Sequence, residues 1–311
     1  MKIVVTGALG HIGSRLIREL PVWRPGCEVV MVDNLSSQRY CSLFDLPGGA
    51  RYRFVEIDVA KADLGPLLSG ADAVFHLAAL TNAAGSFEIA QELERNNFNA
   101  TERVARACLT AKAPLVYLSS TSVYGTSAAQ IDEDCSEEEL KPQSPYAQTK
   151  LKEERLVASL AKDGLRSVSL RLGTIFGTSR GMRFHTAVNK FCWQACVGQP
   201  ITVWRTAYDQ KRPYLDLEDA LRAFKLVLDQ DLFDGGLYNA LTANLTVSRI
   251  VAEIRRHAPD LRIEFVDTKI MNQLSYEVLD RKFRAKGFSP QGDIRRGVAD
   301  TMTLLRAVRS A

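Results

Sequence analysis

Tyr146 and Lys150 stand four positions apart, and together they could remove a proton from an alcohol. No other of the nine tyrosines has a lysine four residues further along. On a helix this spacing places both side chains on one face, and a nearby ammonium lowers the pKa of a tyrosine from about 10 toward neutral pH. A Tyr-x-x-x-Lys spacing without other motifs is usually just two exposed residues on a helix. Here Ser119, Ser120 and Thr121 end a predicted strand ahead of it, where ligands bind in open parallel sheets. We therefore predict a catalytic set of Ser120, Tyr146 and Lys150.

A glycine-rich turn follows the first predicted strand. Gly7, Gly10 and Gly13 recur every third residue, and a helical pattern begins among them. Glycines at these positions let the backbone approach a pyrophosphate, whose charge then lies at the N–H groups and positive dipole end of the helix. A tight corner between strand and helix is the alternative. The order strand, turn, helix at the N-terminus favours a dinucleotide site.

Asp33 ends the second predicted strand, twenty residues beyond Gly13. A carboxylate at this place accepts hydrogen bonds from an adenosine ribose and repels a 2′-phosphate. Asp33 therefore predicts NAD rather than NADP. The alternative is an ordinary aspartate in a turn, and the nearby Arg39 keeps NADP open.

Short β-branched runs alternate with longer helical patterns through the first half of the chain. Strands joined by connections of this length must pair in parallel. The runs show little alternation of apolar and polar residues, as expected for strands buried on both faces. The fold class is therefore α/β, a doubly wound parallel sheet with helices on both faces. The predicted strands span 2–6, 28–32, 53–57, 73–76, 115–119 and 167–170, and the predicted helices lie near 13–20, 61–69, 86–111 and 146–162.

The alternation ends after Arg171. Helices are predicted near 185–197, 217–229, 246–256 and 292–308, and strands near 201–204 and 262–265. We predict that residues 1–172 form the dinucleotide-binding domain, to which roughly 200–240 return. Residues 173–200 and 241–311 would form a smaller C-terminal substrate lobe that caps the sheet.

As a set, these motifs resemble the NAD-dependent epimerase/dehydratase family of extended short-chain dehydrogenases/reductases, which includes UDP-galactose 4-epimerase. The resemblance covers nearly the whole chain. Besides the glycine turn and the Tyr-x-x-x-Lys pair, it rests on Asp33-Asn34, Asp58-Val59, His76 to Ala79, Asn96 to Thr101, Ser119 to Gly125, Arg171 to Gly177, Arg212 to Asp219 and Tyr238-Asn239.

This resemblance implies a Rossmann domain, NAD as the cofactor and a nucleotide-sugar substrate. Tyr146 would be the general base, Lys150 would also bind the nicotinamide ribose, and Ser120 would hold the reacting hydroxyl. The other implied cofactor contacts are Gly7, Gly10, His11, Ile12, Gly13, Asp33, Asn34, Ser36, Asp58, Val59, Leu77, Ala78, Ala79, Asn96, Ser119 and Gly173. The implied substrate contacts are Thr81, Ser120, Thr121, Thr174, His185, Thr186 and Arg212.

Three positions depart from the family pattern, and all of them would touch the substrate. Thr174 and Thr186 stand where the family has asparagine, and no arginine matches the family's C-terminal one near Ser275-Tyr276. The sequence therefore leaves the sugar and the nucleotide open.

The run from Ser120 to Gly125 bears on the reaction. It reads Ser-Thr-Ser-Val-Tyr-Gly. The dehydratases and decarboxylases of the family that it resembles have a carboxylate in this run. A 4-epimerase needs only Tyr, Ser, Lys and NAD, so we predict epimerisation at C4 through a transient 4-keto sugar. The alternatives are a nucleotide-sugar oxidoreductase or ketoreductase, a dehydratase or another lyase or epimerase, and a non-catalytic NAD-sensing protein, because fold does not fix function.

Four other features have structural interpretations. We predict that His76 packs or binds backbone, that Trp193 and Trp204 belong to the core, and that the acidic run 132–139 is a solvated loop rather than a metal site. His185 begins a predicted helix, where it could reach a sugar hydroxyl or a phosphate.

Composition excludes several classes of protein. The net charge of +4 is too small, and the basic residues too scattered, for nucleic-acid binding. No stretch approaches the roughly 18 apolar residues of a membrane span, and no signal segment follows Met1. The six cysteines form no Cys-x-x-Cys pair, so we expect reduced thiols and no metal. We expect a cytoplasmic homodimer, because the helical stretches 86–111 and 146–162 resemble the family's dimer-forming pair.

Overall fold

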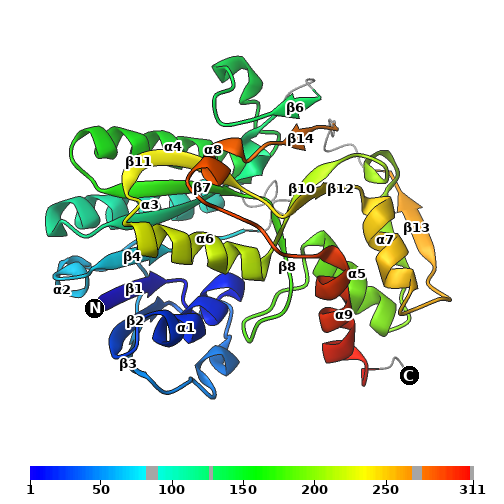
Figure 1. The fold of residues 1–311 in the computed structure, drawn as a ribbon, viewed down its shortest axis with the longest axis horizontal. Helices are drawn as coiled ribbons and strands as arrows, with labels where there is room; N and C mark the ends of the chain where they lie inside the picture. Colours follow the sequence, from blue (N-terminus) through cyan, green and yellow to red (C-terminus); the bar gives the residue numbers. More distant parts are fainter. Residues whose placement is uncertain (82–89, 126–128, 268–274, 309–311) are drawn as a thin grey trace.

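A parallel sheet of seven strands forms the centre of the computed structural model, which describes residues 1–81, 90–125, 129–267 and 275–308. The strand order is β11-β7-β5-β4-β1-β2-β3 (Figure 1), so the predicted doubly wound sheet is confirmed. The strands are β1 (Lys2–Thr6), β2 (Cys27–Asp33), β3 (Ala50–Glu56), β4 (Ala73–His76), β5 (Leu115–Ser120), β7 (Ser167–Leu172) and β11 (Asp234–Ala240).

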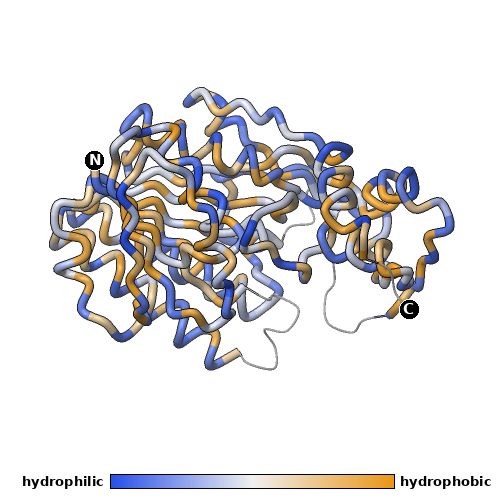
Figure 2. The backbone as a smooth tube through the Cα atoms, turned by 90° about the horizontal axis from the view of Figure 1, so that it is seen from below, coloured by the Kyte–Doolittle hydropathy of each residue, from blue (hydrophilic) through white to orange (hydrophobic). Residues whose placement is uncertain are grey.

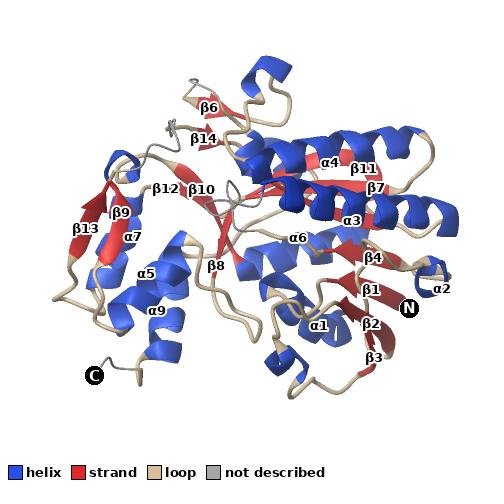
Figure 3. Ribbon diagram, turned by 180° about the vertical axis from the view of Figure 1, so that it is seen from behind, coloured by secondary structure: helices blue, strands red, loops and turns tan. Residues whose placement is uncertain are grey.

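Both faces of the sheet are covered by helices, which explains the continuous apolar runs. In β1, Ile3 and Val5 belong to one buried cluster and Val4 to the other. Each such side chain contributes roughly 1.5–3 kcal/mol when it is fully buried. Helices α1 (His11–Trp23) and α6 (Leu217–Gln230) cover one face (Figure 1), and α3 (Ala90–Ala111) and α4 (Pro145–Lys162) cover the other (Figure 3). The tube in Figure 2 shows apolar segments concentrated between these layers.

A smaller lobe lies beyond the carboxyl ends of the strands (Figure 1). It has its own apolar cluster, which includes Phe176, Val188 and Ile250. Its strands are β8 (Thr174–Phe176), β10 (Arg212–Asp216) and β12 (Ala243–Leu245), which form one sheet, and β9 (Ile201–Trp204) and β13 (Ile263–Val266), which form another. Its helices are α5 (Ala187–Cys196), α7 (Val247–Arg255) and α9 (Ile294–Leu305). Two further elements, β6 (Gln130–Ile131) and β14 (Glu277–Val278), pair with each other, and α8 (Arg281–Ala285) follows β14.

Several predicted elements differ from the observed ones. The helix predicted near 61–69 is only α2 (Gly65–Leu68), and the first four residues of the stretch predicted at 86–111 lie outside the described residues. Within 200–240, α6 and β11 return to the large sheet, whereas β9 pairs with β13 in the smaller lobe. The sequence pattern could not separate these because a short apolar strand looks the same in either lobe.

The order of the strands decides where a ligand can lie. The chain runs outward from β1 to β3 and then returns to β4 on the other side of β1, so β1 and β4 flank the topological switch point. In open parallel sheets, ligands bind outside the carboxyl ends of the strands at this point. Across the described parts of the chain, no helix combines the length and the apolar character needed to cross a bilayer.

Candidate active site

Helix α4 starts at a position that brings its first turn to the carboxyl edge of the sheet. The Ser144 side chain accepts a hydrogen bond from the Ala147 N–H at 3.2 Å, and Pro145 occupies the first helical position. Both features stabilise a helix N-terminus. Tyr146 therefore lies in the first turn and Lys150 one turn further on. The two side chains are close enough to interact electrostatically, as their spacing predicts.

Lys150 is buried and tightly bonded. Its Nζ donates to the Leu118 carbonyl at 3.0 Å and to Oε2 of Glu153 at 2.8 Å. Burial by itself lowers the pKa of Lys150, but Glu153, Tyr146 and Glu154 together outweigh it and raise this pKa above its usual value. Lys150 is therefore a fixed positive charge beneath Tyr146.

Ser120 is the last residue of β5, and its hydroxyl faces a cavity. Its Oγ accepts hydrogen bonds from the N–H of Ser122 at 3.2 Å and from Oγ of Ser122 at 2.9 Å. Thr121 also lines the cavity, and its hydroxyl donates to the Leu172 carbonyl at 3.2 Å. The short 3₁₀ turn Thr121–Val123 holds this group at the end of the strand.

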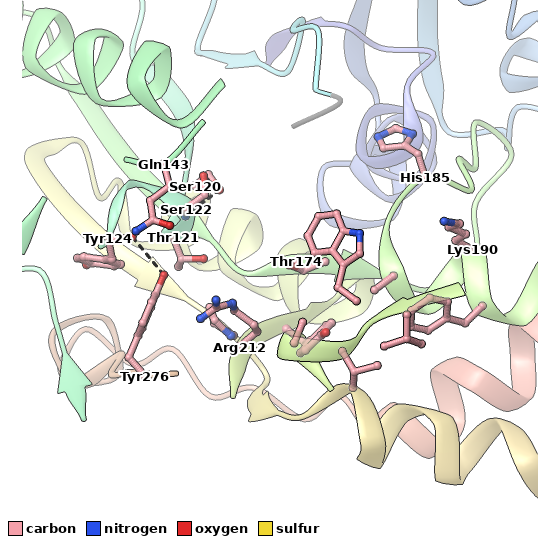
Figure 4. Close-up of a pocket in the computed structure, with 18 of the residues that line it drawn as sticks. Ser120, Thr121, Ser122, Tyr124, Gln143, Thr174, His185, Lys190, Arg212 and Tyr276 are labelled. Carbon is pink, nitrogen blue, oxygen red and sulfur yellow. Dashed lines mark hydrogen bonds between the residues drawn. The ribbon is translucent and has the colours of Figure 1, made fainter. Parts of the chain in front are cut away.

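The cavity has a volume of about 410 Å³ and lies between the sheet and the smaller lobe (Figure 4). Its polar and aromatic lining comes from both parts: Ser120, Thr121, Ser122, Tyr124, Gln143, Thr174, His185, Lys190, Thr202, Trp204, Arg212, Tyr214 and Tyr276. Among the described residues that line it there is no aspartate or glutamate. Lys190 and Arg212 give it a positive character, which suits an anionic ligand.

The glycine turn next to β1 is built for close backbone approach. Gly7 has φ +65°, and a Cβ there would lie 2.6 Å from the Ala78 N; a Cβ at Gly13 would lie 2.4 Å from the Gly7 carbonyl. Gly10 precedes α1 without a side-chain cap, and the first turn of α1 carries no acidic residue. The uncapped N–H groups of His11, Ile12 and Gly13 therefore fit a dinucleotide pyrophosphate.

Asp33 ends β2 and faces this turn. Its Oδ2 accepts a hydrogen bond from the Leu9 N–H and its Oδ1 from the Leu35 N–H, both at 3.0 Å. A carboxylate oxygen has two lone-pair sites, so each oxygen keeps one for a ribose hydroxyl. The geometry fits the predicted role and adds another, because Asp33 also fastens the glycine turn to β2.

The other predicted cofactor residues surround the same edge of the sheet. Oδ1 of Asn34 accepts a hydrogen bond from the Ser36 N–H at 3.0 Å, and Asp58 pairs with Lys61 at 3.2 Å. Val59 is buried in the apolar cluster, and Leu77, Ala78 and Ala79 are half-buried after β4. Asn96 is half-buried on α3.

Asn97, which the sequence reasoning missed, holds the loop after β4. Its Oδ1 accepts a hydrogen bond from the Leu80 N–H at 2.8 Å, and its Nδ2 donates to the Leu80 carbonyl at 2.9 Å. The helical spacing from buried Leu93 to Asn97 and Thr101 could have indicated an inward-facing polar residue.

Two predicted site residues use their side chains elsewhere. The Ser119 hydroxyl is buried and donates to Glu154, and the Thr186 hydroxyl donates to the Ile175 carbonyl at 3.3 Å. Gly173 lies where β10 passes closely, since a Cβ there would meet the Pro213 carbonyl at 3.1 Å. These three residues shape the site through the fold.

A loop of the smaller lobe closes over the glycine turn. A Cβ at Gly181 would lie 2.2 Å from the Leu9 carbonyl, and Nδ1 of His11 is 2.8 Å from Oγ of Ser179. Burial and the positive charge of Arg183 lower the pKa of His11 to about 3, so its imidazole is neutral. His185, at the far end of this loop, has its pKa lowered to about 4 by the same two causes.

Arg183 is the most unusual residue of this loop, and the sequence reasoning missed it. Its Nη1 donates to the hydroxyl of Thr81, which is 102 residues away in the chain. Its Nε is buried without a hydrogen-bond partner, and among the described residues it has no ion-pair partner. Burial lowers the pKa of Arg183, and its guanidinium interacts electrostatically with Tyr146. A half-buried guanidinium whose buried Nε has no hydrogen-bond partner, and which lies near the predicted base, suits an anionic ligand.

The predictions for Trp193 and Trp204 were wrong. Trp193 is 36% exposed and packs on Phe184, and Trp204 lines the cavity at the end of β9. Gln143, Lys190 and Tyr276 also line the cavity, although no motif singled them out. Gln143 precedes α4, Lys190 lies in the first turn of α5 and Tyr276 precedes β14, so only their positions near these element starts could have indicated them.

His76 and the acidic run keep structural roles. His76 is buried between the hydroxyls of Thr6 and Thr101, at 2.8 and 3.2 Å, so it binds side chains rather than backbone. Within 132–139, Glu133 is not simply solvated. It is half-buried, its carboxylate accepts a hydrogen bond from the Asn239 N–H at 2.5 Å, and burial raises its pKa.

Residues 3–240 match the model of the NAD dependent epimerase/dehydratase family. The chain belongs to this family. The resemblance stated from the sequence is thereby confirmed, and NAD is the cofactor. This epimerase/dehydratase family contains several reactions, so membership establishes an enzyme class and leaves the individual activity to the site.

Three similar proteins illustrate that range. A trifunctional UDP-glucose 4,6-dehydratase/3,5-epimerase/reductase of Arabidopsis thaliana is 29% identical over 96% of this chain. The chain spans 46% of that protein and of the next two curated relatives, about half their length. Among solved structures, MoeE5 with UDP-glucuronic acid and NAD is 28% identical, with a TM-score of 0.85 and 99% coverage of both chains. The UDP-glucuronic acid 4-epimerase from Bacillus cereus, with the same ligands, is 25% identical, with a TM-score of 0.87 and 99% coverage of both chains.

Proposed function

We propose that this family member is an NAD-dependent nucleotide-sugar epimerase that inverts C4 through a transient 4-keto sugar. One observation carries the proposal: the described lining of the cavity places Ser120 beside Thr121 and Ser122, with no carboxylate. Elimination of water needs an additional acid and base, whereas epimerisation needs only a reversible oxidation. The site therefore supports epimerisation better than dehydration.

We assign a separate role to each of the three predicted catalytic residues. Ser120 would hold the O4 hydroxyl at the cavity wall, and Tyr146 would take its proton and later return it. Lys150 would stabilise the phenolate and present its remaining N–H to the nicotinamide ribose. When bound, NAD supplies reversible hydride transfer at C4. The keto sugar must then turn over before the hydride returns to its other face.

The far part of the cavity suits a nucleoside diphosphate. Lys190 on α5 and Arg212 on β10 would neutralise phosphate charge, and the half-buried Trp204 offers an aromatic surface for a base. Arg212 lies over the ring of Tyr276 at 5.1 Å, which orients its guanidinium. The solved relatives carry UDP-sugars, which supports a UDP-linked substrate.

Arg183 favours a uronic acid as the sugar. A carboxylate at C6 would be attached to C5, the neighbour of C4, and Arg183 is close enough to the proposed base Tyr146 to interact with it electrostatically. A carboxylate would also give a hydrogen-bond acceptor to the buried Nε of the half-buried Arg183 guanidinium. Similar structures hold UDP-glucuronic acid and also UDP-glucose, so the choice between these two sugars rests on Arg183.

A panel of UDP-glucuronic acid, UDP-glucose and UDP-N-acetylglucosamine, read by mass spectrometry and NMR, tests the proposal. We expect a C4 epimer of unchanged mass without accumulation of NADH. Loss of water or carbon dioxide would establish a lyase, stoichiometric NADH would establish a net oxidoreductase, and no turnover of any sugar would favour an NAD-sensing protein.

Arg183→Met tests the sugar. It should lower kcat/KM for the uronic acid relative to the neutral sugar by roughly 30-fold, about 2 kcal/mol, as expected when one partner of a buried charge pair is removed. Arg180→Met is the matched control, because Arg180 is an exposed arginine that pairs with Asp45 at the surface. An equal loss for both sugars would contradict the assignment to C6.

The remaining expectations are also proposals. We propose the domain boundaries 1–172, 173–200 and 241–311, with 200–240 shared as described above, a cytoplasmic location, and a homodimer formed through α3 and α4. Light scattering that detects only monomer at micromolar concentration would contradict the dimer.

A further inference from the structure

Lys150 has a buried counter-charge of its own, Glu153, on the next turn of α4. The Glu153 side chain is 0% exposed and that of Lys150 is 6% exposed. Oε2 of Glu153 lies 2.8 Å from Nζ of Lys150 and accepts a second hydrogen bond from the Tyr117 hydroxyl at 2.6 Å. The Tyr117 ring lies beneath Nζ, with its centroid 5.0 Å away. The ammonium is thus held on three sides.

A buried ion pair of this kind does not by itself indicate a contribution to folding stability. Removing two charges from water costs several kcal/mol per ion, and apolar residues of similar size often fill such a position equally well. Oε1 of Glu153 is buried without a hydrogen-bond partner, so the carboxylate is also incompletely compensated. The pair therefore calls for an explanation from the site that it adjoins.

Two effects on the site follow from the geometry. An ammonium has three donors, and Lys150 uses two of them on Leu118 and Glu153, which fixes its position and leaves one N–H. In addition, a negative charge 2.8 Å from the ammonium opposes its field at the Tyr146 phenol. Glu153 thus keeps Lys150 charged while moderating its influence on Tyr146.

We propose that Glu153 is a positioning residue that fixes Lys150 and sets the pH range in which Tyr146 can act as the base. The inference rests on the proposed function, because it takes Tyr146 to be that base. Glu153 is not among the described residues that line the cavity, and its side-chain hydrogen bonds in the described part of the chain go to Lys150 and Tyr117. It acts through Lys150.

Other charged and titratable groups surround the pair. They are His76 on β4, Tyr117 on β5, Tyr146 and Glu154 on α4, Arg171 on β7 and Arg183 before α5. Glu154 is already bound by Arg171 through two hydrogen bonds, and burial together with Lys150 keeps His76 neutral near pH 7. Glu153 is therefore the negative charge in direct contact with Lys150.

The test is an ultraviolet difference titration of phenolate in the NAD-bound enzyme, with the Tyr146→Phe form of each variant subtracted. Glu153→Gln removes the charge and keeps the shape. We expect its Tyr146-dependent midpoint to fall by roughly one pH unit, the lower range for loss of a neighbouring charge. NAD binding should also weaken at alkaline pH in this variant, because Lys150 loses the carboxylate that keeps it protonated.

Glu153→Asp and Glu253→Gln are the matched variants. Glu153→Asp keeps the charge, so the midpoint of its Tyr146-dependent titration should stay close to that of the wild type even if turnover falls. If Glu153→Gln does not hold NAD, the midpoint of Glu153→Asp is the measurement that tests the inference. Glu253→Gln removes another buried carboxylate, on α7, and should leave the midpoint unchanged. An unchanged or raised midpoint in Glu153→Gln, or a fall of the same size in Glu153→Asp, would overturn the inference. The titration needs no sugar, so a failure to turn over any nucleotide sugar would count against the proposed function alone.

Discussion

The Asp33 carboxylate accepts the backbone N–H of Leu9 at 3.0 Å, which ties the end of β2 to the glycine turn after β1. The residue that we predict to discriminate between NAD and NADP therefore also holds the turn that we predict to carry the cofactor phosphates. Substitutions at this position separate the two roles.

Asp33→Ala should weaken NAD binding and relax the preference over NADP, because it removes both the ribose acceptor and the anchor of the turn. Asp33→Asn keeps an acceptor for Leu9 and loses only the charge, so it should relax the preference with a smaller loss of NAD affinity. Calorimetric titration with both cofactors measures each effect. A tenfold preference of the wild type for NADP, about 1.4 kcal/mol, would refute the assignment of Asp33.

Tyr146→Phe should lower turnover by roughly 10²–10⁴-fold, the usual contribution of a positioned acid or base. The aromatic ring remains, so folding and NAD binding should survive. Lys150→Ala should damage both turnover and cofactor binding, and Ser120→Ala should cost less than either, because it leaves the base in place. Near wild-type turnover of a Tyr146→Phe enzyme that holds NAD would mean that another residue removes the proton, with His185 the first to examine.

His76 should make the protein sensitive to mild acid. Burial, followed by the charge of Lys150, lowers the pKa of His76 from 6.5 to about 3. The unfolded chain therefore binds an additional proton between these values. The contribution of neutral, buried His76 to the free energy of unfolding is complete above about pH 6.5. It is lost toward pH 3, at up to about 1.4 kcal/mol per pH unit. Urea unfolding of His76→Gln should show a shallower decline between pH 6 and pH 4, whereas exposed His257→Gln should decline as the wild type does.

Arg171 should be important for stability. It binds both carboxylate oxygens of Glu154, at 2.9 and 2.7 Å, and the Tyr124 hydroxyl at 2.9 Å, all in the interior. Arg171→Met leaves Glu154 buried without a counter-charge, which should cost about 3–5 kcal/mol of unfolding free energy. Arg166→Met removes an exposed ion pair with Asp231 and should cost less than about 1 kcal/mol. If urea unfolding shows the same loss of unfolding free energy in Arg171→Met and Arg166→Met, the buried ion pair contributes no more to stability than the exposed one.

The sequence by itself determined the features that depend on neighbours along the chain. The spacing of Tyr146 and Lys150 guarantees a shared helical face, and the Gly7–Gly13 turn lies directly between a strand and a helix. Likewise, β-branched runs separated by long connections can only form a parallel sheet, so the fold class and the family were both readable.

Only the tertiary structure decided which distant residues complete the site. Arg183 reaches Thr81 across 102 residues, and Lys190, Trp204 and Tyr276 line the same cavity as Ser120 from separate parts of the chain. Glu153 could be placed on the Lys150 face from its spacing, but its contact with Tyr117 depends on how α4 packs on β5. Periodicity records which side of an element is buried, whereas the partner on that side is fixed by the packing of elements joined through long, irregular loops. That is why the fold class, the family and the cofactor could be predicted from the sequence and the sugar could not.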